Sequence, residues 1–139
     1  MIEQFKNELK NLEYYKESLT KVSDSLSLNW YELTGVKGVQ YDKQRGAFNK
    51  DIADKRKYYL LGKIEAQEQE KRRLQANVQY IEDVLSLIKD QEIREAIVNI
   101  YVHKKTFRKE AKKHYMSHVT LYNQINKQLK EALKKTYDL

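Results

Sequence analysis

The chain contains no cysteine and no proline, and only four of its 139 residues are glycine. Without cysteine it can form no disulfide, no Cys-ligated zinc site and no thiol nucleophile, a composition compatible with a reducing cytosol. A β-sandwich would normally need more proline and glycine for its turns, so helices are favoured. No apolar run approaches 18 residues, and Met1 leads into Glu3 rather than into a basic segment. We therefore expect an all-α cytoplasmic protein with no membrane span and no signal peptide.

Positive charge is in excess, and it is concentrated at one end. Lysine and arginine number 27 against 20 aspartates and glutamates, a net charge of +7. Residues 1–102 carry 17 charges of each sign, whereas residues 103–139 carry ten cations, three carboxylates and all three histidines. A neutral body with one basic end is typical of a module that binds a polyanion, although a solvated lysine-rich tail has the same composition.

Residues 1–89 predict two long helices. Apolar side chains recur every three or four residues over 2–27 and again over about 50–89, whereas 29–49 shows no helical period and holds three of the four glycines. The second helix would reach roughly 60 Å at 1.5 Å per residue, which is too long without a partner. That partner is either the first helix, folded back antiparallel through a 29–49 connector, or a second chain in a dimeric coiled coil; we favour the intramolecular hairpin. Gln67 and Lys71 interrupt the apolar stripe, which indicates either a protein-binding stretch or a solvent-facing break.

Residues 90–139 predict three shorter helices. Asp90 can cap the first, which ends near His103; Thr106 can cap the second, Phe107 to His114; and Ser117 can cap the third, His118 to about Lys135. The last helix has an apolar face consisting of Leu121, Ile125, Leu129, Ala132 and Leu133.

The last two of these helices match the requirements of a helix-turn-helix. A small residue, Ala111, stands where the helices would cross; Met116 can fill the gap at the turn; and Ser117 and Leu121 supply the cap and the inward aliphatic side chain. The turn usually begins with glycine, but Tyr115 stands there, so the turn must either carry strain or adopt another geometry. Residues 90–139 are therefore expected to form a DNA-binding domain that follows the helical hairpin.

The outward face of the last helix has the side chains with which a major groove can be read: an amide for adenine, a valine for a thymine methyl, hydroxyl and imidazole groups, and a lysine. The expected base-reading residues are His118, Val119, Tyr122, Asn123, Asn126 and Lys127. Cations and hydroxyls around the preceding helix would contact phosphates. The expected phosphate contacts are Lys104, Lys105, Arg108, Lys109, Lys112, Lys113, Ser117 and Thr120.

The segment from Asp90 to Leu133 resembles region 4 of bacterial sigma factors, which reads the promoter −35 element. The residues that carry the resemblance are Ile93-Arg94-Glu95, Tyr101, Thr106-Phe107, Glu110-Ala111 and Ser117-His118-Val119-Thr120-Leu121-Tyr122. More narrowly, the chain is similar to the small sigma-like regulators of Gram-positive phages and prophages, the ArpU/RinA-type group, whose members also have a loop of the type Leu33–Gly38 followed by Tyr41-Asp42-Lys43. This resemblance implies an activator of phage late genes that binds double-stranded DNA and engages the RNA polymerase of a bacterial host.

Other function classes have less support. His114 and His118 are four residues apart, but Ser117 breaks the helix between them, and no His-Glu-x-x-His motif, phosphate-binding glycine loop or Gly-x-Ser-x-Gly motif occurs. We therefore expect neither an enzyme nor a metal or cofactor site. Two alternatives remain: a DNA-packaging protein like the small terminase subunits, and a coiled-coil interaction protein with a basic tail. The long helix could additionally support a homodimer or bind a regulatory protein.

Overall fold

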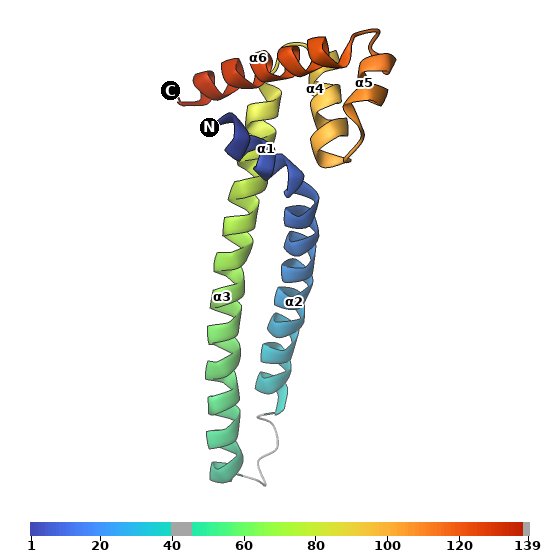
Figure 1. Ribbon diagram of the computed structural model, residues 1–139. Coiled ribbons are helices and arrows are strands. Elements are labelled where there is room, and N and C mark those ends of the chain that lie inside the picture. The colour runs from blue at the N-terminus through green and yellow to red at the C-terminus, as the bar shows by residue number, and fades with distance from the viewer. Residues whose placement is uncertain (40–45, 138–139) are drawn as a thin grey trace. The chain divides into compact units, whose positions relative to one another are not determined.

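A computed structural model describes the backbone of residues 1–39 and 46–137 and the side chains of 1–35, 52 and 54–137. Over these ranges every regular element is a helix and there is no strand, which confirms the all-α expectation (Figure 1). In the same ranges no helix is long and apolar enough to cross a membrane. The elements are α1 (Ile2–Lys10), α2 (Leu12–Val39), α3 (Gly46–Ser86), α4 (Gln91–Ile97), a π-helix (Val98–Val102), α5 (Phe107–Lys113) and α6 (His118–Tyr137).

The chain divides into two compact units. The first consists of Met1–Lys16 together with Ala76–Leu139, and the second of Glu17–Gln75. This division differs from the expected one at residues 89 and 90, because α2 and α3 each contribute residues to both units.

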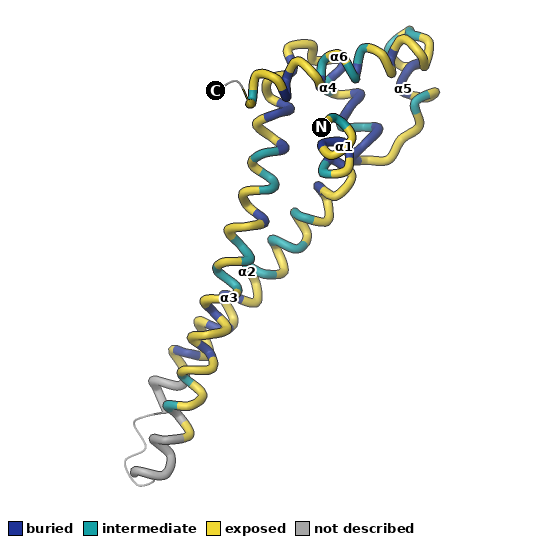
Figure 2. Tube along the Cα trace, turned by 60° about the vertical axis from the view of Figure 1, so that its left-hand side comes forward, coloured by how far each residue is buried: buried dark blue, intermediate teal, exposed yellow. Residues whose placement is uncertain are grey.

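In the second unit, α2 and α3 lie side by side (Figures 1 and 2). Their apolar contact is made by four buried side chains, Leu26, Leu33, Leu60 and Ile64. Asn29 is also buried, and its Nδ2 donates a 2.6 Å hydrogen bond to Oε1 of Gln67. Glu32 and Arg56 form an ion pair at 3.4 Å. Residue 29 pairs with residue 67 and residue 32 with residue 56, so α2 and α3 run antiparallel. Gln67, which interrupts the apolar stripe of α3, therefore has a polar partner within the chain.

The helix boundaries correct the expected connector. The helix expected over 2–27 is interrupted at Asn11 and then continues to Val39, and α3 already begins at Gly46. The expected 29–49 connector is therefore wrong over 29–39 and 46–49, and its central part, 40–45, lies outside the described residues. Leu33 extends the apolar stripe seven residues beyond Leu26. Gly35 does not end the helix, because a mid-helix glycine costs only about 1 kcal/mol relative to alanine.

The core of the first unit collects side chains from both ends of the sequence. All five residues of the expected inward face of α6 are buried, which confirms the predicted apolar face of this helix. α1 packs against α6 and the π-helix, and its Phe5 and Leu9 are 2% and 0% exposed. The end of α3 contributes Ile81, Val84 and Leu85 to the same core. The C-terminal helices therefore complete their core with residues that precede position 90.

A buried lysine strengthens the contact between α1 and the C-terminal helices. Lys6 is only 5% exposed, and its Nζ lies 3.5 Å from Oε1 of Glu3. The same ammonium lies 5.6 Å from the ring centre of Tyr101 and 5.0 Å from that of Tyr122, close enough for cation–π attraction to both rings. Burial raises the pKa of the Tyr101 hydroxyl to about 12. The Lys6 charge is thus accommodated by one carboxylate and two uncharged aromatic rings.

Replacing Phe5 with alanine is expected to lower the free energy of unfolding by about 3–5 kcal/mol, because it leaves a cavity in the shared core. Chemical denaturation of the full chain measures this loss. Tyr14→Ala is the matched control: Tyr14 is 66% exposed, and its loss should change stability by no more than about 0.5 kcal/mol. Equal effects of the two substitutions would show that α1 does not contribute to the core.

Candidate nucleic-acid interface

Both helices of the pair α5–α6 begin with a side-chain cap, as the sequence predicts. Oγ1 of Thr106 accepts a hydrogen bond from the Lys109 amide at 3.3 Å. Oγ of Ser117 accepts one from the Thr120 amide at 3.1 Å and donates to Oγ1 of Thr120 at 2.8 Å. The Ser117 proton is thus used within the cap, whereas the Thr120 hydroxyl proton remains available to an outside acceptor.

The turn between α5 and α6 keeps a standard geometry at the cost of strain. Tyr115 has a φ of 58°, in the left-handed region. Its amide donates to the Lys112 carbonyl at 3.3 Å, and the Met116 amide donates to the Ala111 carbonyl at 2.9 Å. These two bonds form a Schellman motif, whose left-handed position is usually glycine. A residue with a Cβ in the left-handed conformation costs roughly 1–2 kcal/mol of stability. Of the two outcomes expected from the sequence, strain or another turn geometry, the turn therefore shows strain.

The side chains expected to hold the two helices together occupy the expected positions. α5 packs directly against α6. Ala111 is 3% exposed and Leu121 is fully buried, and Met116 is half-buried against the same core. Phe107 completes the contact, with its ring centre 6.1 Å from that of Tyr101 and 5.9 Å from that of Tyr122.

A buried group of polar side chains, Glu110, His114 and Asn99, was not predicted from the sequence. The carboxylate of Glu110 is 4% exposed, and its Oε2 accepts a hydrogen bond from Nδ2 of Asn99 at 3.3 Å. Nε2 of His114 lies 3.4 Å from the same oxygen. The four-residue spacing of Glu110 and His114 was the available sequence signal, but it does not distinguish a buried pair from a solvated one. The group connects α5 to the π-helix.

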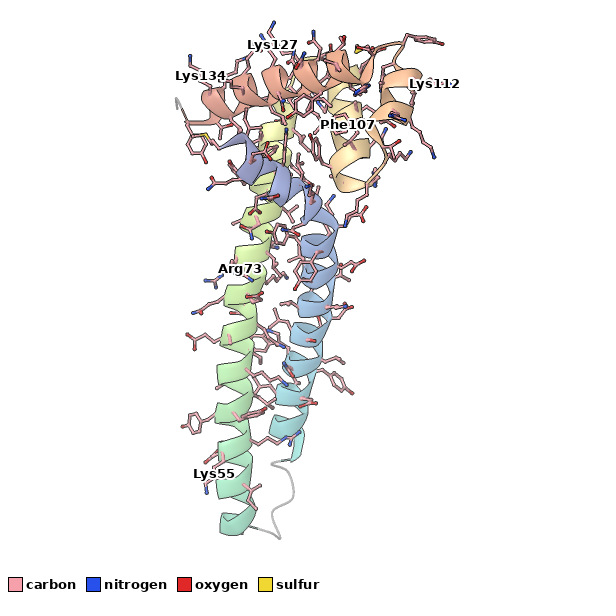
Figure 3. The ribbon with its side chains drawn as sticks, viewed as in Figure 1. Lys55, Arg73, Phe107, Lys112, Lys127 and Lys134 are labelled. Atoms are coloured by element: carbon pink, nitrogen blue, oxygen red, sulfur yellow. The ribbon has the colours of Figure 1, made fainter. Side chains whose placement is uncertain are left out.

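Five of the six expected base-reading residues are exposed along α6. Tyr122 is one of them, and the other four are His118, Val119, Asn123 and Lys127. The last three follow one another at intervals of four residues and therefore lie in one stripe, here called the outer stripe of α6. Figure 3 shows Lys127 pointing away from the neighbouring helices.

Tyr122 and Asn126 lie at the edge of this face and contact other parts of the protein. The Tyr122 ring packs against Phe107 and Lys6, although 45% of the residue stays exposed. Asn126 is half-buried, and its Oδ1 is buried with no hydrogen-bond partner among the described residues.

The expected phosphate-binding cations are exposed, but they are not equivalent. Within the described ranges, only Lys113 among these six has a carboxylate at ion-pair distance: its Nζ lies 2.8 Å from Oε1 of Glu95. That hydrogen bond, reinforced by the opposite charges, lowers the pKa of the Glu95 carboxyl below its ordinary value of 4.5 and raises the pKa of Lys113. The five without such a carboxylate are Lys104, Lys105, Arg108, Lys109 and Lys112.

Two further lysines belong to the surface and were missed in the sequence. Lys130 and Lys134 are exposed and continue the outer stripe three and seven residues after Lys127. Figure 3 shows Lys134 pointing outwards near the end of α6. Their helical spacing from Lys127 was the signal that could have identified them.

No family model, no curated protein and no solved structure matches this chain. Within the described residues, no group of three or more histidine, cysteine, aspartate or glutamate side chains could hold a metal ion.

The substitution Tyr115→Gly is expected to increase the free energy of unfolding by about 1 kcal/mol, because it removes the Cβ that makes the left-handed conformation costly. The greater freedom of glycine in the unfolded chain offsets part of the gain. Thermal and chemical unfolding measure the change. Tyr115→Ala keeps a Cβ and should give no gain; an equal gain from alanine would place the cost in the ring rather than in the backbone.

Replacing Lys113 with methionine should return the pKa of Glu95 towards 4.5, as followed by carboxyl carbon NMR during an acid titration. Because the folded-state pKa is lowered, the stabilisation from this pair is present above the unfolded pKa and is lost as the pH falls through the folded one. Lys112→Met is the control, since no carboxylate of the residues that the structure describes lies at ion-pair distance from Lys112. An unchanged Glu95 pKa in the Lys113 variant would contradict the pairing.

Proposed function

We propose that the chain is a sequence-specific double-stranded-DNA-binding transcriptional regulator, in which α5, the turn and α6 act as a helix-turn-helix. α6 is then the recognition helix that enters the major groove. The observation that carries the proposal is the outer stripe of α6, where Val119, Asn123 and Lys127 are exposed together beside a row of cations. The strained turn and the two caps support it, because they hold the two helices at one angle.

The outer stripe has the chemistry that base reading needs. The Asn123 amide can pair bidentately with the N6 and N7 edge of adenine, and Val119 can contact a thymine methyl group. Lys127 can donate to guanine O6 or N7. His118 lies at the start of α6, from which recognition helices usually reach base edges.

The cations around α5 supply binding that is independent of sequence. Lys109 and Lys112 have no carboxylate partner within the described ranges. They can neutralise phosphates and release counterions, and the Thr120 hydroxyl can donate to a phosphate oxygen. Lys113 must first exchange Glu95 for a phosphate, so we expect it to contribute less than Lys112. Lys130 and Lys134 extend the positive surface along α6.

The resemblance to sigma region 4 and to the ArpU/RinA-type regulators supports a more specific role. The chain would activate late genes of a phage or prophage by binding next to a promoter and contacting the RNA polymerase in the cytoplasm of a bacterial host. A DNA-packaging protein or a coiled-coil interaction protein would instead lack a promoter-like target.

Selection of binding sites from random duplex DNA, at two salt concentrations, tests the proposal. We expect one enriched motif, with affinity that falls steeply as salt rises because phosphates are neutralised by lysines. Recovery of no motif, with binding equal for all duplexes, would leave only a non-specific polyanion surface. The absence of any duplex binding would overturn the proposal.

Two substitutions separate base reading from phosphate binding. Asn123→Ala should reduce discrimination between selected and random duplexes by about 1–3 kcal/mol, whereas Lys112→Ala should weaken both duplexes alike and reduce the salt slope by about 1. Affinity titrations at several salt concentrations measure both effects. Asn7→Ala and Lys63→Ala are the matched controls, since both residues are exposed on other helices. Equal losses on both duplexes for Asn123→Ala would exclude it from base reading.

A further inference from the structure

Among its described residues, the second unit exposes more large apolar side chains than it buries. Its contact between α2 and α3 uses the four residues Leu26, Leu33, Leu60 and Ile64. Seven others remain more than a third exposed: Leu28, Trp30, Tyr31, Ile52, Tyr58, Tyr59 and Leu61. Two packed helices can each cover only one face of the other, so exposed aromatic residues opposite the contact indicate a further partner.

The outward face of α3 has a central line of uncharged residues, two of them small, that allows close approach. Tyr58, Gly62 and Ala66 follow one another at four-residue intervals, and all three are exposed. They lie on the opposite side of the helix from the buried Leu60 and Ile64, as the 100° step per residue requires. Tyr58 is 73% exposed, and a Cβ added at Gly62 would meet nothing within 4 Å. The helix thus carries a glycine that costs stability and that no contact within the described residues requires.

The charges on this face fit a second copy of the same helix. Lys55 and Glu65 are exposed on the same side of α3 and form no ion pair with any described residue. The pair Lys55–Glu65 is centred on residue 60, and so is the pair Tyr58–Gly62. A twofold antiparallel contact centred at the level of residue 60 therefore brings each Lys55 level with the Glu65 of the other chain. It also brings each Tyr58 ring level with the glycine of the other chain, where there is no side chain to displace. Lys57 and Lys63 share the same midpoint but lie about 120° around the helix from this face.

The outer face of α2 does not have this self-complementarity. Tyr31 and Gly35 repeat the tyrosine–glycine spacing, and a Cβ at Gly35 would also meet nothing within 4 Å. Their midpoint is residue 33, and no two oppositely charged residues of the sequence are centred on it within the helix. The charge pattern thus distinguishes α3 from α2.

We propose that a second copy of this chain docks antiparallel on the outer face of α3, with Tyr58 packed on Gly62 of the other chain and Lys55 paired with its Glu65. The contact closes on itself, so it gives dimers rather than open polymers. It uses residues of α3, none of which belongs to the α5–α6 surface.

Sedimentation equilibrium of the full chain without DNA tests the dimer and its interface. We expect a monomer–dimer equilibrium with a dissociation constant of roughly micromolar order, as suits one small interface. Gly62→Leu should weaken it at least about tenfold, while leucine favours the helix more than glycine does. Gly35→Leu is the matched control and should leave the equilibrium unchanged. A monomer throughout the micromolar range, or equal weakening by both substitutions, would overturn the proposal.

Charge reversal tests the antiparallel register. Lys55→Glu and Glu65→Lys should each weaken self-association, because each places like charges at the same level of the two helices. Mixing the two variants should restore dimers, since every Lys55–Glu65 position then pairs opposite charges across the interface. Sedimentation of the mixture in low salt measures the recovery. Failure of the mixture to associate, with wild-type chain dimeric, would contradict this register; trimers or larger species would contradict the twofold contact.

Discussion

The burial of α1 in the core of the C-terminal helices is the contact on which the rest of the first unit depends. Phe5 and Leu9 fill space that α4, the π-helix and α6 leave open, and Lys6 places its charge beside the rings of Tyr101 and Tyr122. Because Leu121, Ile125 and Leu129 share this core, α6 is fixed about its own axis. The orientation of the outer stripe towards solvent follows from that packing.

The charges that the α5–α6 surface presents also depend on the neighbouring helix α4. Lys112 and Lys113 are adjacent in the sequence, yet among the described residues a carboxylate, that of Glu95 in α4, lies at ion-pair distance from Lys113 alone. Of these two lysines, a phosphate that approaches α5 therefore meets one without a carboxylate partner in the described part of the chain and one that already has a partner. Exposed pairs of this kind exchange partners readily, because water and salt screen them. The Tyr115 turn is the more rigid element, since both of its backbone hydrogen bonds end on α5.

The outer faces of α6 and α3 differ in composition, and in each case the composition suits a different kind of partner outside the chain. On α6 the exposed stripe is polar and cationic, which suits a hydrated, charged groove. On α3 the stripe contains tyrosine, glycine and alanine beside one charge of each sign, which suits another helix of the same kind. Both are faces whose opposite side is already buried, so their composition reflects what lies outside the chain rather than what packs within it.

Much of this could be predicted from the sequence, because local chemistry determines it: the all-α class, the caps Asp90, Thr106 and Ser117, and the inward face from Leu121 to Leu133 follow from side-chain period and hydrogen-bonding capacity. The left-handed Tyr115 was one of two outcomes that the sequence left open. Other features depend on contacts between residues distant in the chain. The docking of α1, the Glu110 group, the Lys113–Glu95 pair and the contacts of Tyr122 with Phe107 and Lys6 were decided by tertiary packing. A helical period specifies which residues share a face, but only the neighbouring helices determine how wide that face is and which charges are already paired.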